Sequence, residues 1–398
     1  MNFSTALSPI MIGIGSGILF LQGCADIRSL PIIHALLVVV AIINAMQDFS
    51  EKLDALTHTG WLFTKENGAV RCHACAHRCL IQSGKRGICQ MRVNIGDELR
   101  VPWGYVAAAN VDPIEKKPFM HFLPGSDALT FGMLGCNFHC DFCQNWISSQ
   151  ALRDPASASS TRYIQEVSSK ELVRYALRSG AEIIASSYNE PLITSEWAID
   201  IFKLAKESGL KTVYVSNGFA SPEVLHALRP FLDGYKIDLK CLSDEKYRNL
   251  GGNLQVVQDT IELAYDLGMW VEVVTLVIPE FNDSNEELWN TARYLSGISM
   301  DIPWHVSAFY PTYKHLNTER TPADTIQRAA EIGQEAGLRY VYAGNLPGRV
   351  GSLENTYCPH CQALLIERTG YSVRSNRITA EGTCPQCGKA IAGVWAEQ

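Results

Sequence analysis

The feature that most constrains the fold is a regular alternation of short apolar runs with amphipathic helical patterns between residues 128 and 344. The apolar runs are rich in β-branched residues, which predicts strands, and the segments between them carry apolar residues at helical spacing. This order is typical of βα units and a parallel sheet. The seven predicted strands are ALTFGML (128–134), AEIIASS (181–187), KTVYVS (211–216), GYKIDL (234–239), WVEVVTLVI (270–278), PWHVSAF (303–309) and RYVYAG (339–344).

Three of the helices between these strands have clear sequence boundaries. They are SKELVRYALRSG (169–180), SEWAIDIFKLAKESG (195–209) and NEELWNTARYLSG (285–297), and each ends in glycine, as a helix commonly does. In the first of them, Leu172, Tyr175 and Ala176 recur at helical spacing. Seven strands come close to the count of a closed barrel, so we expect an α/β fold built on a partial (βα) TIM-like barrel.

Polar side chains follow the predicted strands at the ends where barrel enzymes carry their chemistry. Functional residues in such folds come from several strand ends at once, so this coincidence indicates a site. In strand order the candidates are Cys136, Asn189 and Glu190, Ser216 and Asn217, Asp238 and Lys240, His305 and Tyr310, and Asn345.

The stretch GCNFHCDFCQNW (135–146) places three cysteines, Cys136, Cys140 and Cys143, on the loop after the first predicted strand. Structural zinc sites and ordinary iron–sulfur sites take four protein ligands, so a set of three is either incomplete or open. Three thiolates can hold three corners of a cubane [4Fe-4S] cluster and leave the fourth iron to a small chelating molecule. Phe142, between the last two cysteines, is expected to shield such a cluster.

Two further cysteine groups flank the predicted barrel. Short CxxC-type groups in a chain of this length are typical of metal binding rather than of a disulfide scaffold. The N-terminal group is expected to bind zinc or an auxiliary iron–sulfur cluster, with His73 and His77 as substitute ligands. The C-terminal group is expected to bind structural zinc, with an auxiliary cluster as the alternative. The expected ligands are Cys72, Cys75, Cys79 and Cys89 in the first group, and Cys358, Cys361, Cys384 and Cys387 in the second.

The remaining cysteines, Cys24 and Cys241, stand alone and are predicted to be buried or incidental. The segment DPIEKKPFMHFLPGS (112–126) is expected either to line the mouth of the site or to brace the N-terminal cysteine module, with His121 packed and hydrogen-bonded. The predicted organisation is an apolar extension (1–46), a Cys-rich module (47–125), the partial barrel (126–350) and a paired-CxxC, zinc-ribbon-like module (351–398).

Charge and cysteine usage limit the partners and the compartment. The 34 basic and 41 acidic residues give a net charge of -7, which argues against nucleic acid as an obligatory partner. Eleven of the thirteen cysteines lie in metal-type groups, which indicates a reducing compartment, so we expect a cytoplasmic protein. Residues 1–46 hold two apolar stretches, each shorter than the ~20 residues that span a bilayer. Two hypotheses stay open for this segment: membrane or lipid association, or a non-native extension before a true start at Met46.

The loop CNFHCDFC resembles the CxxxCxxC loop of radical S-adenosylmethionine (radical SAM) enzymes, including the aromatic residue before the third cysteine. The resemblance implies that Cys136, Cys140 and Cys143 bind a [4Fe-4S] cluster whose open iron takes S-adenosylmethionine. It further implies reductive cleavage of that cofactor to methionine and a 5′-deoxyadenosyl radical, which abstracts hydrogen from a substrate.

Other segments fit the same resemblance. YNEP (188–191) is similar to the GGEP motif of these enzymes, which suggests that Glu190 holds the amino group of the cofactor. SNG (216–218) and DLK (238–240) are similar to segments that contact its ribose and carboxylate in glycyl-radical-enzyme activases. The expected cofactor contacts are Phe142, Asn189, Glu190, Ser216, Asn217, Asp238, Lys240 and His305.

A longer resemblance covers roughly residues 65–396. CHACAHRC, DPIEKKPFMHFLPGS, GCNFHCDFCQNW and the terminal CxxC pairs are together similar to the radical enzymes of the AmmeMemoRadiSam system, which are related to pyruvate formate-lyase activating enzymes. The resemblance implies Memo-type and AMMECR-type partners and an electron donor of the flavodoxin or ferredoxin type. It leaves the substrate open, a protein glycyl residue being one candidate. Two hypotheses from other classes also stay open: a zinc-stabilised regulatory or binding protein, and an RNA-modifying radical SAM enzyme.

Overall fold

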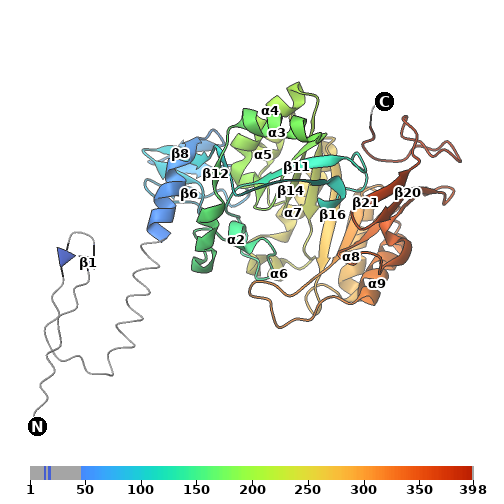
Figure 1. The fold of residues 1–398 in the computed structure, drawn as a ribbon. Coiled ribbons are helices and arrows are strands. Elements are labelled where there is room, and N and C mark those ends of the chain that lie inside the picture. Colours follow the sequence, from blue (N-terminus) through green and yellow to red (C-terminus); the bar gives the residue numbers. More distant parts are fainter. Residues whose placement is uncertain (1–12, 15–16, 19–45, 397–398) are drawn as a thin grey trace, which may run out of the picture. The chain divides into compact units, whose positions relative to one another are not determined.

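The computed structural model describes residues 13–14, 17–18 and 46–396 of the chain (Figure 1). Its internal contacts divide the chain into two units, Met1–Asp48 and Phe49–Gln398. In the first unit, β1 (Gly13–Ile14) and β2 (Gly17–Ile18) form an antiparallel pair. Most of the predicted extension, with Cys24, lies outside the described residues, so both hypotheses for it remain predictions. None of the helices that the structure describes is long and apolar enough to cross a bilayer.

The second unit is built around an eight-stranded sheet with the order β10-β11-β13-β14-β15-β16-β17-β18 (Figure 1). From β11 to β18 all neighbouring strands pair in parallel, and these strands correspond to the seven predicted runs. The exception is β10, which pairs antiparallel with β11. The bounds are β10 Ala108–Pro113, β11 Asp127–Gly132, β13 Ile183–Ser186, β14 Lys211–Ser216, β15 Gly234–Asp238, β16 Trp270–Val277, β17 Trp304–Ala308 and β18 Val341–Gly344.

The parallel strands with helices between them confirm the predicted α/β class. Within the part of the chain that the structure describes, no strand pairing joins β10 to β18, so the sheet is open and has two edges. The barrel-like curvature remains a prediction. All parallel strands point the same way. Their carboxyl ends, and the loops that follow them, therefore lie at the same end of the sheet.

Helices connect the parallel strands. The α-helices are α2 Trp146–Ser149, α3 Ser169–Ser179, α4 Ser195–Glu207, α5 Pro222–Leu228, α6 Asp244–Asn249, α7 Leu254–Asp266, α8 Asn285–Ile298 and α9 Ala323–Glu335. Within the described residues, four 3-10 helices add to them: η2 Ile114–Lys116, η3 Pro155–Tyr163, η4 Pro191–Thr194 and η5 Gly351–Glu354.

Helix α3 shows why the sequence predicts these boundaries well. Ser168 accepts the Glu171 N–H while the Glu171 carboxylate accepts the Ser168 N–H, a capping box that fixes the start. Gly180 ends the helix with φ 74, a conformation that glycine adopts without steric cost. The buried face carries Leu172, whereas Tyr175 is 42% exposed, so the predicted apolar spacing only partly marks the core. The prediction that a glycine ends α8 is wrong, since that helix runs on to Ile298.

Two small three-stranded sheets form the N-terminal cysteine module. One has the order β3-β8-β7 and the other β4-β5-β6. Cys72 is the last residue of β5, and its N–H donates to the Cys79 carbonyl at 3.0 Å, which closes the turn that carries Cys75. The bounds are β3 Thr57–Thr59, β4 Phe63–Glu66, β5 Ala69–Cys72, β6 Leu80–Gln82, β7 Val93–Ile95 and β8 Glu98–Pro102; a further pair joins β9 Tyr105–Val106 to β12 Gln165–Glu166.

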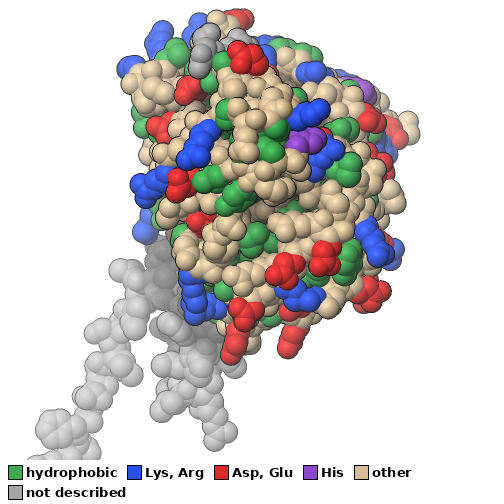
Figure 2. All heavy atoms as spheres, turned by 90° about the vertical axis from the view of Figure 1, so that its right-hand side faces the viewer, with side chains coloured by type: hydrophobic (Ala, Val, Ile, Leu, Met, Phe, Trp, Pro, Cys, Tyr) green, Lys and Arg blue, Asp and Glu red, His purple; other side chains and the backbone are tan. Residues whose placement is uncertain are grey.

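The C-terminal module is a three-stranded antiparallel sheet of β19 (Thr356–Tyr357), β20 (Leu364–Thr369) and β21 (Ser372–Asn376), followed by an irregular segment. It packs on the segment between β10 and β11: the Val394 N–H donates to the His121 carbonyl at 2.7 Å, and the Leu123 N–H to the Val394 carbonyl at 2.8 Å. On the face shown in Figure 2, acidic and basic side chains are interspersed.

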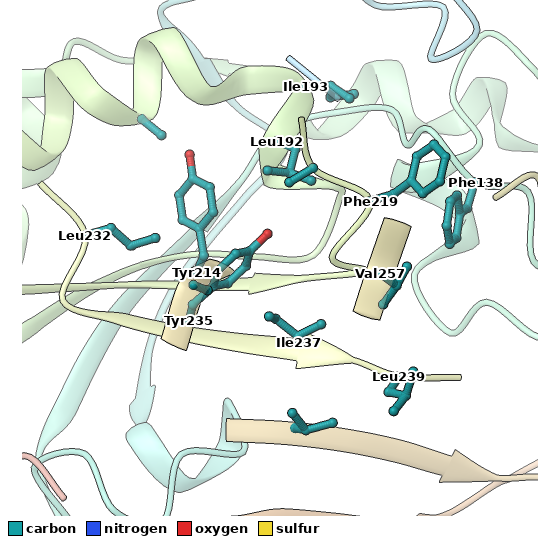
Figure 3. Packing of buried hydrophobic residues seen from close by; sticks show 14 of the residues in the cluster. Phe138, Leu192, Ile193, Tyr214, Phe219, Leu232, Tyr235, Ile237, Leu239 and Val257 are labelled. Atoms are coloured by element: carbon teal, nitrogen blue, oxygen red, sulfur yellow. The ribbon is translucent and has the colours of Figure 1, made fainter. Parts of the chain in front are cut away.

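A packed core lies around β14 and β15 (Figure 3). The rings of Tyr214 and Tyr235 on neighbouring strands have centroids 6.0 Å apart, and those of Phe138 and Phe219 are 5.3 Å apart. Phe138 belongs to the three-cysteine loop and is buried, which stabilises the loop by roughly 1.5–3 kcal/mol. An added Cβ on Gly252 would lie 2.3 Å from the Phe138 ring, so glycine leaves room for this contact.

Candidate active site

The three-cysteine loop begins directly after β11 and is held from below by the N-terminal module. Gly135 has φ 89, and a Cβ built there would lie 2.2 Å from Met91 Cγ and 3.2 Å from the Cys89 carbonyl oxygen. Glycine is therefore required by both the backbone conformation and the close approach of the two segments. Cys140 is buried, and Cys136 and Cys143 are half-buried.

Hydrogen-bond donors face the sulfur atoms of this loop. The Phe138 N–H donates to Cys136 Sγ at 3.3 Å, and the Asn217 side-chain amide approaches the same sulfur at 3.8 Å. Cys143 Sγ lies 3.2 Å from Ser149 Oγ. Burial raises the pKa of Cys140 to about 12 although Lys240 lowers it, so the ionised thiolate needs a bound cation to be stable in this position.

The donor set fits an iron–sulfur cluster better than a single ion. Donor atoms of Cys136, Cys140 and Cys143 do not all lie within 4.8 Å of one another, which is the spacing that the C-terminal cysteines show. Ligands of one tetrahedral ion with bonds of about 2.3 Å must be closer than that. A cubane cluster places several irons between its thiolates and leaves one iron open when only three are present.

A cavity of about 440 Å³ opens beside the cysteine loop, within the range of small-molecule sites. Its walls come from the loop itself, from the strands β14 to β18, from the segment after β10 and from the C-terminal module. The polar and cysteine side chains that line it are Glu115, Lys116, Lys117, Cys140, Cys143, Gln144, Asn145, Ser187, Tyr188, Lys236, Asp238, Lys240, His305, Ser307, Tyr342, Asn345 and Tyr371.

Four of the eight expected cofactor contacts line this cavity: Phe142, Asp238, Lys240 and His305. Asp238 receives hydrogen bonds from Lys236 and, at 3.1 Å, from Lys240. Burial would raise the pKa of Asp238, but the two lysines lower it to about 2, so the carboxylate is ionised at neutral pH. The cavity therefore carries a fixed pattern of one anion between two cations.

Ser216, Asn217 and Glu190 gather behind the loop, next to Cys136. The buried Glu190 carboxylate accepts hydrogen bonds from Ser216 Oγ at 2.7 Å and from the Asn217 N–H at 2.8 Å. Burial raises the pKa of Glu190 to about 7, although these hydrogen bonds lower it. Asn189 is bound within the chain, since its Oδ1 accepts the Met133 N–H at 3.0 Å. The cofactor roles of these four residues remain predictions.

Sequence reasoning missed Lys236 and Glu272, two charged residues inside parallel strands. Glu272 is fully buried and accepts hydrogen bonds from the Met120 and His121 N–H groups, the Trp270 indole and His305 Nε2, the last at 2.7 Å. It thus orients the His305 ring at the cavity wall. A charged residue in the middle of an apolar run is the signal that could have found both, because burial of a charge requires a partner.

The segment 112–126 lines the cavity and contacts the C-terminal module. Glu115 is buried, accepts the Gly125 N–H at 3.1 Å and pairs with the buried Arg368 at 3.4 Å. Of the two roles expected for the segment, cavity lining is confirmed. His121 is packed as predicted: its ring nitrogens lie 2.6 Å from the Ala392 carbonyl and from the Tyr342 hydroxyl.

The cavity also includes Tyr371, at the turn between β20 and β21, which the sequence did not indicate. Tyr310 and Asn345 were expected near the strand ends, and they bond to each other, the Tyr310 hydroxyl donating to the Asn345 carbonyl at 2.9 Å. Asn345 lines the cavity. Cys241 is buried, as predicted for an isolated cysteine.

The C-terminal cysteines form a compact metal-type group. The sulfur atoms of Cys358, Cys361, Cys384 and Cys387 all lie within 4.8 Å of one another, with Cys358–Cys387 at 3.6 Å and Cys361–Cys384 at 3.7 Å. Four sulfurs around one tetrahedral ion at about 2.3 Å are separated by roughly 3.8 Å. The arrangement therefore fits a single tetrahedral ion.

Comparison with known proteins places this geometry in a family. The radical SAM superfamily pattern matches residues 131–295. An uncharacterized protein of Methanocaldococcus jannaschii is 37% identical over 329 residues, which cover 82% of this chain and 96% of that protein. The pyruvate formate-lyase-activating enzyme of Clostridium pasteurianum is 26% identical over 182 residues, 44% of this chain and 71% of that enzyme. The GTP 3′,8-cyclase of Aquifex aeolicus is 24% identical over 259 residues, 59% and 77% of the two chains.

The last two relatives are named for different activities, so sequence identity at this level does not identify the reaction of this chain. The superfamily domain matched in this chain implies a [4Fe-4S] cluster and S-adenosylmethionine, and the matched residues begin in β11 and include the three-cysteine loop. The chain belongs to the radical SAM superfamily.

Proposed function

We propose that this protein is a radical SAM enzyme of the AmmeMemoRadiSam type, in which Cys136, Cys140 and Cys143 hold the catalytic cluster and the adjoining cavity receives the substrate. The bound cluster and cofactor supply a 5′-deoxyadenosyl radical by reductive cleavage of S-adenosylmethionine. The observation that carries the proposal is the position of the loop: two of its three thiols form one end of a cavity whose other walls come from β14 to β18.

The chain's own residues have three tasks in this proposal. Glu190, Ser216 and Asn217 bind the cofactor beside Cys136, and Lys240 with Asp238 binds its charged groups at the cavity wall. Phe142 excludes water from the cysteine loop, since its buried ring packs 5.6 Å from that of Phe281. His305, held by Glu272, lines the cavity and contacts the cofactor.

The substrate of the proposed enzyme carries groups that can bind side chains of both charge signs, because four lysines and two carboxylates line the cavity. A protein glycyl residue is one candidate. The proposal includes a flavodoxin- or ferredoxin-type electron donor, and Memo-type and AMMECR-type proteins as partners.

Anaerobic reconstitution tests the function. With iron, sulfide, reductant and S-adenosylmethionine, the full chain is expected to turn brown and to release 5′-deoxyadenosine and methionine, measured by chromatography and mass spectrometry. Incubation with candidate extracts in deuterated form is expected to place deuterium in 5′-deoxyadenosine when the substrate is present. A colourless protein that binds only zinc and releases no 5′-deoxyadenosine would favour the regulatory or binding alternative.

We further propose that the C-terminal cysteines hold structural zinc, because the sulfur separations of 3.6 and 3.7 Å match a tetrahedral ion. Elemental analysis is expected to find one zinc per chain that Cys361→Ala removes. Loss of zinc is also expected to lower the melting temperature, since closed zinc sites contribute directly to folding. Retention of the zinc in Cys361→Ala would contradict the assignment, and Cys241→Ala, outside the group, is the matched control.

A further inference from the structure

The N-terminal cysteines form a second four-thiol group that the proposed function does not use. Cys72, Cys75 and Cys89 are buried and Cys79 is half-buried; the first two and Cys79 belong to the β5–β6 hairpin, and Cys89 lies between β6 and β7. The Cys72 N–H donates to the Cys79 carbonyl at 3.0 Å, and the pKa of each of the four thiols is raised by at least one of the others, so the four side chains are neighbours. Four cysteine thiols grouped in an apolar interior indicate a metal or cluster site, because hydrophobic packing alone does not require four thiols.

The spacing of these sulfur atoms differs from that of the C-terminal group. Among the residues that the structure describes, only Cys358, Cys361, Cys384 and Cys387 form a set of three or more ligand atoms within 4.8 Å of one another. Neither the described N-terminal thiols nor those of the three-cysteine loop form such a set. Thiolates at the corners of a cubane are farther apart than those around one ion, because the irons lie between them.

The two neighbouring histidines are engaged elsewhere. His73 Nε2 lies 3.0 Å from Thr64 Oγ1, and its Nδ1 lies 3.3 Å from the Arg78 guanidinium. His77 Nε2 lies 3.0 Å from the Asn137 carbonyl. The mixed Cys/His ligand sets that the sequence left open are therefore not favoured, and the four thiols remain as the ligands.

Donors compensate the charge that four thiolates would carry. Backbone N–H groups of Ala74, His77 and Ile88 face Cys72, Cys75 and Cys79 respectively, the last at 3.5 Å. The N–H groups of Met91 and Arg92 both face Cys89. Hydrogen bonds to sulfur are a main means by which proteins stabilise an iron–sulfur cluster and set its potential.

A buried cation adds to these donors. The Arg92 guanidinium is 1% exposed and lies close enough to Cys72 and Cys89 to lower the pKa of both. A cluster held by four thiolates carries net negative charge, and the guanidinium side of the Arg92–Glu196 ion pair is the side that acts most strongly on Cys72.

The group lies against the catalytic loop. The Cys89 carbonyl would be 3.2 Å from a Cβ on Gly135, the residue before Cys136. Arg153 joins the two loops by donating to the Ile88 carbonyl at 2.7 Å and to the Cys136 carbonyl at 3.1 Å. A redox centre here would be a direct neighbour of the catalytic one.

From this geometry we propose that Cys72, Cys75, Cys79 and Cys89 bind a second iron–sulfur cluster, of the cubane type and fully ligated by protein. This cluster differs from the catalytic one in having no open iron. Its electrons therefore come from and go to other redox centres, such as the neighbouring catalytic cluster, rather than to a bound small molecule.

The triple variant Cys136→Ala, Cys140→Ala, Cys143→Ala tests this inference, because it leaves the N-terminal module intact. After anaerobic reconstitution it is expected to hold about four irons per chain, against about eight in the wild type, with one zinc in both. Its reduced electron paramagnetic resonance signal is expected to be unchanged by S-adenosylmethionine. Iron at background, with or without a second zinc, would overturn the inference.

A second variant controls for adventitious iron. Adding Cys72→Ser and Cys75→Ser to the triple variant is expected to reduce iron to background while the zinc remains. Four irons persisting in that variant would overturn the assignment of ligands. Failure of the proposed function has a different signature, since it would leave the wild type with its iron but without 5′-deoxyadenosine.

Discussion

Cys140→Ala is expected to abolish 5′-deoxyadenosine formation by the reconstituted protein. Cys140 is the middle cysteine of the loop and lines the cavity, and without it two protein thiols remain for the catalytic cluster. A cubane cluster with two protein ligands is not retained, so neither the electron nor the open iron is available. The measurement is 5′-deoxyadenosine released per chain with excess reductant and cofactor, together with iron content.

The matched control for this variant is Cys241→Ala. Cys241 is also buried, lies just after β15 and donates only to the Ser243 carbonyl, at 3.6 Å. It is expected to keep wild-type iron content and cofactor cleavage. Retained zinc in Cys140→Ala shows that the variant is folded. Cofactor cleavage by Cys140→Ala at the wild-type rate, with the catalytic cluster absent, would contradict the proposed function.

Glu196→Gln is expected to lower the free energy of unfolding by about 3–5 kcal/mol, the typical cost of leaving one member of a buried ion pair alone. The Arg92 and Glu196 side chains are 1% and 0% exposed and form two hydrogen bonds, of 2.7 and 2.6 Å. Glu196 also accepts the Leu62 N–H at 3.2 Å, so it links α4 to the N-terminal module. Urea unfolding of the metal-loaded protein, followed by fluorescence, measures the change.

Two further variants make this stability prediction specific. Arg248→Ala removes an ion pair with Asp244 whose arginine is 73% exposed, and such pairs contribute at most about 1 kcal/mol. The double variant Arg92→Met/Glu196→Leu is expected to be more stable than Glu196→Gln, because it leaves no unpaired charge in the interior. If Glu196→Gln and Arg248→Ala changed the stability equally, the buried pair would not have the role that its geometry indicates.

The strands of the sheet could be predicted because each parallel strand is buried on both faces and appears as a continuous apolar run. β10 could not, since AANVDP has no such run and five of its six residues are only half-buried. The three-cysteine loop was identifiable from spacing alone. The segment that supports the loop could not be predicted. The close approach of Gly135 to Cys89 joins segments far apart in sequence, and only the folded chain shows it.

The walls of the cavity were partly predictable. Asp238 and Lys240 lie at and just after the end of β15, where the fold class itself directs attention, whereas His305 lies near the start of β17. Lys236 and Glu272 lie inside strands. A strand is predicted from its apolar residues, so a charged residue within the run is not identified as part of a site. Tyr371 belongs to a hairpin turn in another module, and nothing local in TGYS relates it to the cysteine loop.

The contact between Glu115 and Arg368 determines how this protein can be divided. Arg368 also donates to the Met120 carbonyl at 2.8 Å. An isolated β-bridge between Phe122 and Val394 extends this contact between residues 112–126 and the C-terminal module. The unit that can be exchanged between homologous enzymes is therefore not the terminal cysteine module alone. A chimera that transplants residues 351–396 must bring residues 112–126 with them, or it leaves a buried carboxylate without its guanidinium and a cavity without one wall.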